Sequence, residues 1–204
     1  MVNTIKDIIN KLSILGEESL ILFMLSCAER MVPNYLVFYN EVHYGDPSLL
    51  RIALDVVWSW FDTKNSVNID LVALLNNIIN ITPNSEKHYP STLCSYALNS
   101  SVSVYLTVNS IINPIESLTN AHEVAILSSE TVDLYIKESL CYPPYSNSIS
   151  NEYNDSILKH PLMQREIQRQ LLDINYLIDG HIQISELKKC WSNIMVSNIG
   201  FSGN

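Results

Sequence analysis

Apolar side chains recur along much of this chain at the spacing of one face of an α-helix, in segments separated by polar and proline-containing stretches. The first such segment is marked by Ile5, Ile8, Ile9 and Leu12. A second, almost continuously apolar helix follows Gly16. We expect this helix to end near Met31, because Pro33 has no backbone N–H to donate and its ring disfavours a helix interior.

Three more helices are predicted where a proline directly follows a residue that can cap a helix. A proline in the first turn loses only an N–H that has no partner there, and the residue before it can accept a hydrogen bond from a free amide. These starts are Asp46-Pro47, Asn113-Pro114 and His160-Pro161, and the helix at the second of them is expected to begin there or shortly after. At the second of them we expect Glu116 to return a hydrogen bond to the cap.

Apolar periodicity predicts the remaining helices, over residues 69–81, 91–112 and 185–198. The helix that starts at His160 is expected to end at Gly180, since glycine readily adopts the left-handed conformation found after helix ends.

Prolines interrupt the segment Tyr142–Ser148, which is therefore predicted to be a surface loop, and residues 200–204 are expected to fray. No internal repeat and no linker divides the sequence. The pattern predicts an all-α fold, with a single domain over residues 1–204 that contains roughly eight or nine helices.

Composition supports a folded chain with an acidic surface. Hydrophobic residues make up 47% of the sequence and charged residues 16%, which is enough apolar material for a sizeable core. The chain has 12 basic and 21 acidic residues, a net charge of -9, and no Lys or Arg from His88 to Ile136. Binding to nucleic acid through phosphates is disfavoured, because it needs a basic stripe.

Neither a membrane segment nor a disulfide framework is expected. The apolar run Leu20–Ala28 is shorter than the roughly 20 residues of a membrane span and lies too far into the chain for a secretory signal. The four cysteines, Cys27, Cys94, Cys141 and Cys190, form no C-x-x-C pair, which favours buried thiols in a reducing compartment. We therefore expect a cytoplasmic protein.

A cluster of charges lies among residues that otherwise read as core: Glu29 and Arg30 at the end of one apolar segment, and Arg51 and Asp55 on the next helix. Charged groups are rarely buried unless they are paired. In the structural interpretation Arg51 pairs with Glu29 or Asp55 and ties the two helices together.

In the functional interpretation, these charges surround a small polar ligand together with Asn34, Tyr35 and Trp58, and an arginine fork holds its carboxylate or phosphate. His160 and Gln164, four residues apart at a helix start, would complete the pocket if that helix start packed beside Glu29 and Arg51. The full candidate cluster, binding or structural, is Glu29, Arg30, Asn34, Tyr35, Asp46, Arg51, Asp55, Trp58, His160 and Gln164.

Motifs for metals, cofactors and catalysis are weak. His43, Asp46 and Glu41 share a loop, but no H-E-x-x-H or paired-cysteine motif is present, so no metal site is expected. Residues 175–186 resemble a calcium loop, although Leu177 stands at the third ligand position and cannot ligate. The sequence shows no G-x-S-x-G elbow and no glycine-rich phosphate loop, and it predicts no cofactor and no catalytic residue.

Four motifs distributed along the chain resemble the bacterial YjaG-like family, a domain of unknown function. They are C-A-E-R-M-V-P-N-Y at 27–35, G-D-P-x-x-L-R-x-A-L-D-x-x-W at 45–58, H-P-L-M-Q-x-E at 160–166 and S-N-I-G at 197–200. The resemblance implies a soluble, wholly helical bacterial protein and supplies no catalytic residues. The sequence departs from the family at residues 82–87, where the family's acidic stretch is largely missing.

These observations leave three functional hypotheses. The leading one is a non-enzymatic interaction protein whose acidic surface binds a basic partner through a helix face or the Tyr142–Ser148 loop. The alternative is a small-molecule binding protein or enzyme that uses the region of Glu29, Arg51, Asp55 and His160. The third is homo-oligomerisation through the apolar second helix or the last helix.

Overall fold

The structure is a computed structural model that describes residues 4–63, 68–84, 92–140, 151–180, 183–192 and 194–202. These ranges contain nine α-helices and one 3₁₀ turn, and their only β contact is an isolated bridge between Val196 and Ser202. The predicted all-α class is confirmed. The elements are α1 (Ile5–Leu12), α2 (Glu17–Val42), α3 (Pro47–Asp62), α4 (Leu71–Ile81), α6 (Leu93–Ile112), η1 (Pro114–Glu116), α7 (Ser117–Ser139), α8 (Asn151–Lys159), α9 (Pro161–Ile178) and α10 (Ile184–Trp191).

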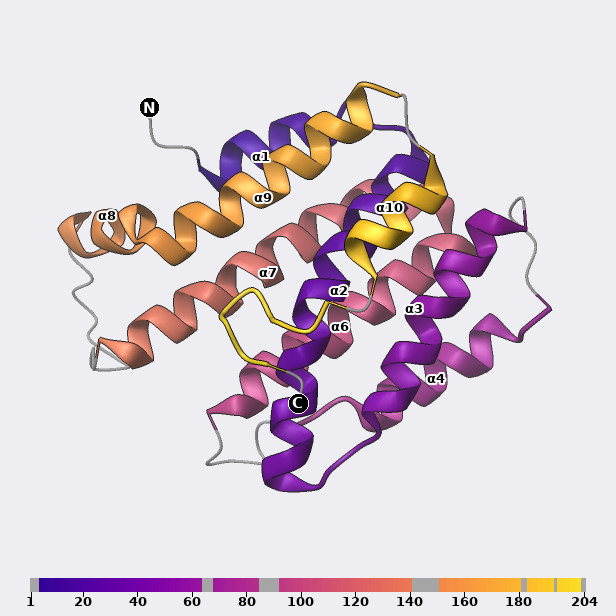
Figure 1. Cartoon of the computed structure of the whole chain (residues 1–204), viewed down its shortest axis with the longest axis horizontal. Coiled ribbons are helices and arrows are strands. Elements are labelled where there is room, and N and C mark those ends of the chain that lie inside the picture. The colour runs from indigo at the N-terminus through magenta and orange to yellow at the C-terminus, as the bar shows by residue number, and fades with distance from the viewer. Residues whose placement is uncertain are drawn as a thin grey trace.

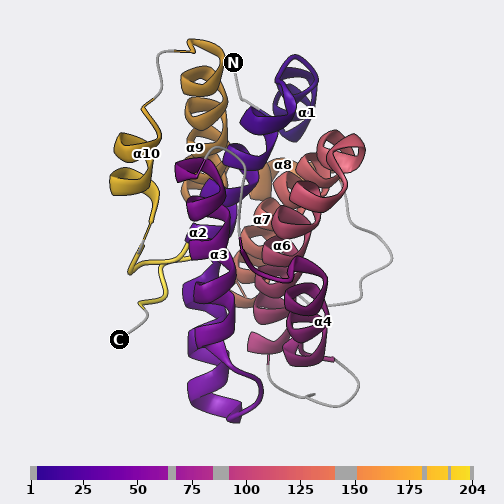
Figure 2. The same ribbon diagram turned by 90° about the vertical axis from the view of Figure 1, so that its right-hand side faces the viewer.

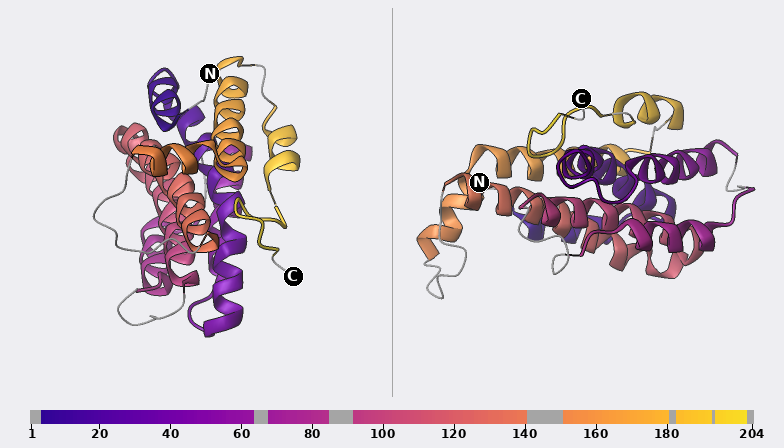
Figure 3. Two further views of the ribbon diagram at one scale, coloured as in Figure 1. Left: turned by 90° about the vertical axis from the view of Figure 1, so that its left-hand side faces the viewer. Right: turned by 90° about the horizontal axis from the view of Figure 1, so that it is seen from below.

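Helix α2 lies at the centre of the bundle (Figures 1 and 2). It packs against α6, α7, α3 and α9, and the long helices α6 and α7 also pack against each other. Helix α10 and the C-terminal segment lie on one outer face and cross over α2, as the two views of Figure 3 show from the side and from below. The elements that surround α2 therefore come from both halves of the sequence.

The prediction that Pro33 ends the second helix is wrong, because α2 continues through Pro33 to Val42. A proline inside a helix costs about 3 kcal/mol. Sixteen of the 26 residues of α2 are buried, so its packing outweighs this cost. Close to the proline, the backbone carbonyl of Arg30 accepts a hydrogen bond from the backbone N–H of Asn198, 3.0 Å away. The carbonyl that Pro33 leaves without its helical N–H is that of Glu29, so this bond fastens the C-terminal segment beside the proline and does not fill the gap in the helical ladder.

Because α2 does not stop at Pro33, it is long and apolar enough to pass a length and hydropathy test for a membrane span. Its most apolar window has a mean hydropathy of 1.3, but 83% of that window is buried inside the protein. That burial is typical of a core helix. The length argument against a membrane span was therefore wrong, because the helix that contains the run has 26 residues.

Two of the three proline-led helix starts form as predicted. Asp46 accepts a hydrogen bond from the backbone N–H of Ser48 at 2.9 Å, and Nδ1 of His160 accepts one from Leu162 at 3.3 Å. The side-chain cap predicted at Asn113 does not form, although the helix begins shortly after it, at Ser117, as expected. A 3₁₀ turn intervenes there, so Glu116 directly precedes α7 and accepts a hydrogen bond from the side chain of Asn109 at 2.9 Å instead.

The C-terminal predictions also need correction. Helix α10 ends at Trp191 rather than near Asn198. Of the tail predicted to fray, residues 203 and 204 lie outside the described residues, whereas Phe201 is bonded to Ser197. The hydroxyl of Ser197 accepts hydrogen bonds from the backbone N–H groups of Ile199 and Phe201, which favours a turn over further helix.

Two further observations complete the comparison with the sequence. Helix α8 was not predicted, and the Tyr142–Ser148 loop lies outside the described residues. The helix predicted from His160 ends as expected, with a left-handed Gly180 at φ 69°.

The loop between α2 and α3 generates a stability prediction. Gly45 has φ 86°, and a Cβ there would lie 1.9 Å from the hydroxyl oxygen of Tyr35, which itself donates to the carbonyl of Ile81. We expect Gly45→Ala to lower the free energy of unfolding by about 2 to 4 kcal/mol, measured by urea denaturation. Gly16→Ala is the matched control, since its Cβ would meet nothing within 4 Å. Equal stability of the two variants would contradict the prediction.

Candidate functional site

Two neighbouring residues of α2 carry opposite charges towards different neighbouring helices. Consecutive helical side chains point about 100° apart, so Glu29 and Arg30 can reach different neighbours. Glu29 binds Arg51 on α3, whereas Arg30 binds Asp173 and Glu166 on α9. Both α2 residues are almost completely buried, at 1% and 4% exposure.

The pair of Glu29 and Arg51 is bidentate. Nη1 and Nη2 of Arg51 donate to the two carboxylate oxygens of Glu29 at 2.6 and 2.8 Å, and Nε1 of Trp58 donates to Oε1 at 2.8 Å. Asp55, whose side chain is 59% exposed, accepts from Nε of Arg51 at 3.1 Å. Although burial opposes its charge, the bond from Arg51 to Glu29 and the charge of Glu29 raise the pKa of Arg51. The arginine fork of this cluster is therefore already occupied by a carboxylate of the protein.

The second cluster surrounds Arg30. Its Nη1 donates to Asp173 at 2.8 Å, and its Nη2 lies 3.4 Å from Oε1 of Glu166. Ser26 donates to the same Asp173 oxygen at 2.7 Å. The Nε of Arg30 is buried and has no hydrogen-bond partner in the part of the chain that the structure describes.

Glu166 is ionised at neutral pH in spite of its burial. Burial alone would favour the neutral acid, but the charge of Arg30 and hydrogen bonds from Gln170 and Ser128, at 2.9 and 2.7 Å, lower the pKa of Glu166. The negative charges of Glu166 and Asp173 likewise raise the pKa of Arg30 above its ordinary value against the effect of burial. These three groups thus form a charged network inside the protein.

The C-terminal strap, defined as residues 194–202, covers this region. Asn198 is its central contact: its side chain donates to the carbonyl of Ser128 at 3.0 Å and accepts from the side chain of Asn34 at 3.1 Å. Arg165 on α9 donates to the backbone carbonyl of Asn198 at 2.8 Å. The strap is anchored further by Phe201, whose ring packs edge-on against Tyr96 and Tyr135.

Two pockets lie on either side of the strap. The arginine pocket, about 370 Å³, is lined by Arg30, Arg165, Glu166, Arg169 and residues 194–198. The Glu29 groove, about 320 Å³, is lined by Glu29, Val32, Pro33, Leu36, Pro47, Ser48, Arg51, Ile194 and Met195. Ile194 and Met195 therefore form walls of both.

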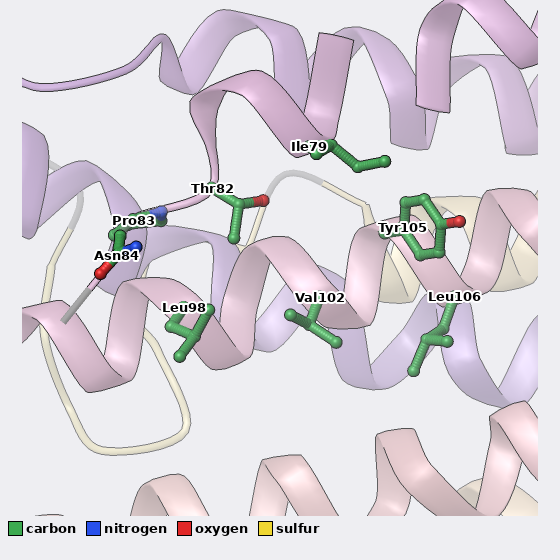
Figure 4. A pocket seen from close by; sticks show the side chains of 8 residues that line it. All are labelled: Ile79, Thr82, Pro83, Asn84, Leu98, Val102, Tyr105 and Leu106. Atoms are coloured by element: carbon green, nitrogen blue, oxygen red, sulfur yellow. The ribbon is translucent and has the colours of Figure 1, made fainter. Parts of the chain in front are cut away.

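A third and larger groove, about 700 Å³, runs between α4 and α6 (Figure 4). Its lining is mainly apolar and consists of Ile79, Thr82, Pro83, Asn84, Leu98, Val102, Tyr105 and Leu106. The hydroxyl of Thr82 donates to the carbonyl of Ile78 within its own helix, at 2.8 Å. These lining residues include no charged side chain. The groove therefore presents a mainly apolar surface without a charged group that could bind a ligand or take part in catalysis.

Not all predicted cluster residues come together. Tyr35 and Asp46 order the loop between α2 and α3, through bonds to Ile81 and Ser48. His160 caps α9, and Gln164 donates to the carbonyl of Leu158 at 2.7 Å, so both belong to the corner between α8 and α9. Neither lines the Glu29 groove or the arginine pocket. The hypothesis that His160 completes a pocket with Glu29 and Arg51 is not what the structure shows.

Several residues of the arginine pocket were missed by sequence reasoning. Arg165 and Arg169 were not singled out, and neither were Glu166 and Asp173 as partners of Arg30. A signal existed for part of this set, because the 160–166 motif ends on Glu166 and the 197–200 motif contains Asn198. Placing them beside Arg30 required the tertiary arrangement of α9 and the strap.

Other reactive groups on the described ranges do not suggest chemistry. Cys27 is fully buried, and burial raises its pKa to about 12, as expected of an inert core thiol. Among the described residues no group of three or more His, Cys, Asp or Glu side chains is placed to hold a metal ion.

Comparison with known proteins gives a family and a fold. The family model described as "Protein of unknown function (DUF416)" matches residues 7–202. The proteins named "Uncharacterized protein YjaG" from Salmonella typhimurium and Escherichia coli K12 are 39% identical over 49 residues, a match that spans 24% of this chain and 25% of each relative. The predicted resemblance to YjaG-like proteins is thereby confirmed.

A crystal structure of a DUF416 family protein from Shewanella baltica OS155 superposes with a TM-score of 0.83. It is 24% identical in sequence, and the match covers 95% of this chain and 97% of that one. At this identity the likeness shows the fold alone, and it supports the all-α arrangement described above.

The buried pair on α2 generates a stability prediction. Arg51→Ala removes the bidentate partner of Glu29 and leaves a buried carboxylate bonded to Trp58. We expect a loss of about 3 kcal/mol in the free energy of unfolding at pH 7, measured by urea denaturation. Asp55→Ala is the control, with an expected loss below about 1 kcal/mol, because Asp55 forms the exposed end of the cluster. A small loss for Arg51→Ala would show that Glu29 is not held by this pair.

The lowered pKa of Glu166 predicts a pH dependence. A carboxylate that binds protons less readily in the folded state contributes stability above its unfolded pKa of about 4.3 and loses this contribution as the pH falls through its folded value. We expect wild type to be more stable than Glu166→Gln at pH 7, and the gap to narrow as the pH falls below about 4.3, by urea denaturation at each pH.

Glu123→Gln, on the exposed surface of α7, serves as the control for this measurement. It is expected to change stability by less than about 0.5 kcal/mol at pH 7. A gap for Glu166→Gln that stays constant or widens at low pH would contradict the assigned ionisation of Glu166.

Proposed function

Because the chain belongs to the DUF416 family of proteins of unknown function, we propose its function from its own geometry: it is a non-enzymatic binding protein that holds a small carboxylate or phosphate in the arginine pocket. The observation that carries this proposal is the convergence of Arg30, Arg165 and Arg169 on one pocket of about 370 Å³. Guanidinium groups match the planar, bidentate geometry of such anions.

The charge balance of the pocket supports an anionic ligand. Glu166 and Asp173 are the carboxylates of this region, and both are bound to Arg30. Arg165 donates to a backbone carbonyl rather than to an acid, and Arg169 forms no hydrogen bond or ion pair with any described residue. The pocket therefore carries excess positive charge in a protein whose net charge is -9.

The spacing of the two exposed arginines points the same way. Arg165 and Arg169 are four residues apart on α9 and so share one face of the helix. Like charges at this spacing destabilise a helix by a few tenths of a kcal/mol. A bound anion between them would offset that repulsion.

Arg30 supplies a further, buried donor. Its Nε–H has no partner among the described residues, and a buried unpaired donor costs about 1 to 3 kcal/mol. Arg30 lines the arginine pocket, so its positive charge adds to the attraction of an anion there.

Binding fits this pocket better than catalysis. Its described lining contains neither a cysteine nor a histidine, and the hydroxyl of Ser197 is engaged by two backbone amides. Glu166 has a lowered pKa, which makes it a poor proton acceptor at neutral pH. The alternative site around Glu29, Arg51 and Asp55 is less suitable, since the fork of Arg51 already holds Glu29.

The acidic surface supports a second proposal, that a basic protein partner binds elsewhere on the molecule. The observation behind it is the net charge of -9, which also disfavours nucleic acid and anionic membranes as partners. A cytoplasmic location belongs to the same proposal and is supported by the free thiols of Cys27, Cys94 and Cys190. A basic partner would bind more tightly after substitution of an arginine by alanine, because the protein would then be more negatively charged.

The anion proposal predicts that Arg169→Ala weakens binding of inorganic phosphate roughly tenfold or more, because a charged hydrogen bond contributes about 1.5 to 3 kcal/mol. The measurement is a titration at constant ionic strength, followed by amide chemical shifts of the full chain. Lys159→Ala removes the same charge from an exposed site, 61% accessible, and is expected to leave the affinity unchanged. Equal weakening in both variants would indicate general charge attraction, and absence of phosphate binding to wild type would overturn the proposal.

A further inference from the structure

The arginine pocket and the Glu29 groove are two compartments of one surface. Ile194 and Met195 of the strap line both, so the two spaces adjoin each other across these side chains. One compartment is lined by Arg165 and Arg169, which pair with no described carboxylate, and by Arg30, which is held by Glu166 and Asp173. The other is walled mainly by aliphatic and proline side chains, namely Val32, Pro33, Leu36, Pro47, Ile194 and Met195.

The polar side chains of the Glu29 groove already have hydrogen-bond partners within the protein. Glu29 and Arg51 line it, but they bind each other through two hydrogen bonds of 2.6 and 2.8 Å. The hydroxyl of Ser48 donates to Asp46 at 2.6 Å. These polar groups would therefore keep their hydrogen bonds if an apolar group entered the groove. The apolar group would also cover apolar side chains that are otherwise in contact with water.

Met195 lies at the junction of the two spaces. It is 57% exposed, and its unbranched thioether side chain can change rotamer at low cost. The neighbouring Val196 is 53% exposed, so the strap presents apolar side chains to solvent directly beside the charged pocket. Exposed apolar groups next to convergent polar groups are the usual composition of a ligand site.

We propose that the ligand is an amphiphilic anion, a free single-chain carboxylate whose head group binds Arg165 and Arg169 and whose aliphatic chain passes Met195 into the Glu29 groove. This inference rests on the proposed anion function of the arginine pocket and names its ligand class. The strap is the shared wall of both compartments and is held in place by hydrogen bonds from Asn198 to Arg30 on α2 and Ser128 on α7.

The test compares acetate, butanoate, hexanoate and octanoate, with inorganic phosphate as the reference, in isothermal titrations of the full chain below micelle-forming concentrations. Each methylene buried in an apolar groove is expected to tighten binding up to about fourfold. We therefore expect octanoate to bind at least tenfold more tightly than acetate.

Two variants locate the chain and the head group. Leu36→Ser, in the groove, is expected to remove most of the dependence on chain length and to leave the phosphate affinity unchanged. Its control is Leu172→Ser, which changes an equally apolar but 65% exposed residue of α9 outside both pockets. Arg169→Ala is expected to weaken the whole series by a similar factor.

The outcomes separate this inference from the proposed function. Phosphate binding with equal affinity for acetate and octanoate overturns the amphiphile and keeps the anion pocket, whereas binding of neither phosphate nor any carboxylate overturns both. A chain-length dependence that survives Leu36→Ser places the chain outside the groove and contradicts the assignment. Should Leu36→Ser fail to fold, the wild-type series alone decides between the first two outcomes.

A lipid head group carries similar chemistry, so a further arm uses vesicles of phosphatidylglycerol and phosphatidylcholine. The protein is expected not to co-float with them, because the strap and the bundle leave room for one chain only in a groove of about 320 Å³. Co-flotation that is lost in Arg169→Ala would overturn the assignment to a free carboxylate.

Discussion

The packing of the bundle depends on two adjacent, oppositely charged residues that are buried on helix α2 and must each be paired. Glu29 and Arg30 lie in its centre at 1% and 4% exposure, and each obtains its partner from a different helix. A buried charge without a partner is strongly destabilising, whereas a buried pair contributes modestly compared with apolar residues of the same size. The two pairs therefore chiefly specify how the helices pack. If α3 or α9 shifted along α2, one of these charges would be left unpaired.

The same stretch of α2 explains why the end of the chain is ordered. One turn before Pro33, the backbone carbonyl of Arg30 accepts a hydrogen bond from the backbone N–H of Asn198. Asn198 in turn bonds to Ser128 on α7 and to Arg165 on α9. The strap thus joins three helices through one asparagine, and its apolar residues are held across the surface where both pockets open.

Local rules predicted most of the fold and only part of the site. The helix starts at Asp46 and His160 follow from caps that involve adjacent residues, and they are correct. Pro33 misled the prediction because the burial that keeps α2 helical comes from elements far away in sequence. Arg30 was recognised as an unusual core charge, but its partners lie 136 and 143 residues away, and a single sequence contains no periodicity that links them.

The contrast between Arg51 and Arg169 separates structural charge from functional charge. The guanidinium of Arg51 makes hydrogen bonds to two carboxylates, one of which is the almost fully buried Glu29, so a ligand there would have to displace a bidentate pair. Arg169 shares a helix face with another arginine, lines a pocket, and binds none of the described residues. Evolution toward stability alone would favour a neutral or acidic residue at such a position, since repulsion from Arg165 costs free energy without an anion. An arginine that pairs with none of the described residues and stands beside a second arginine, in a chain with nearly twice as many acidic as basic residues, contributes little to stability, and this is the ground for the proposed anion site.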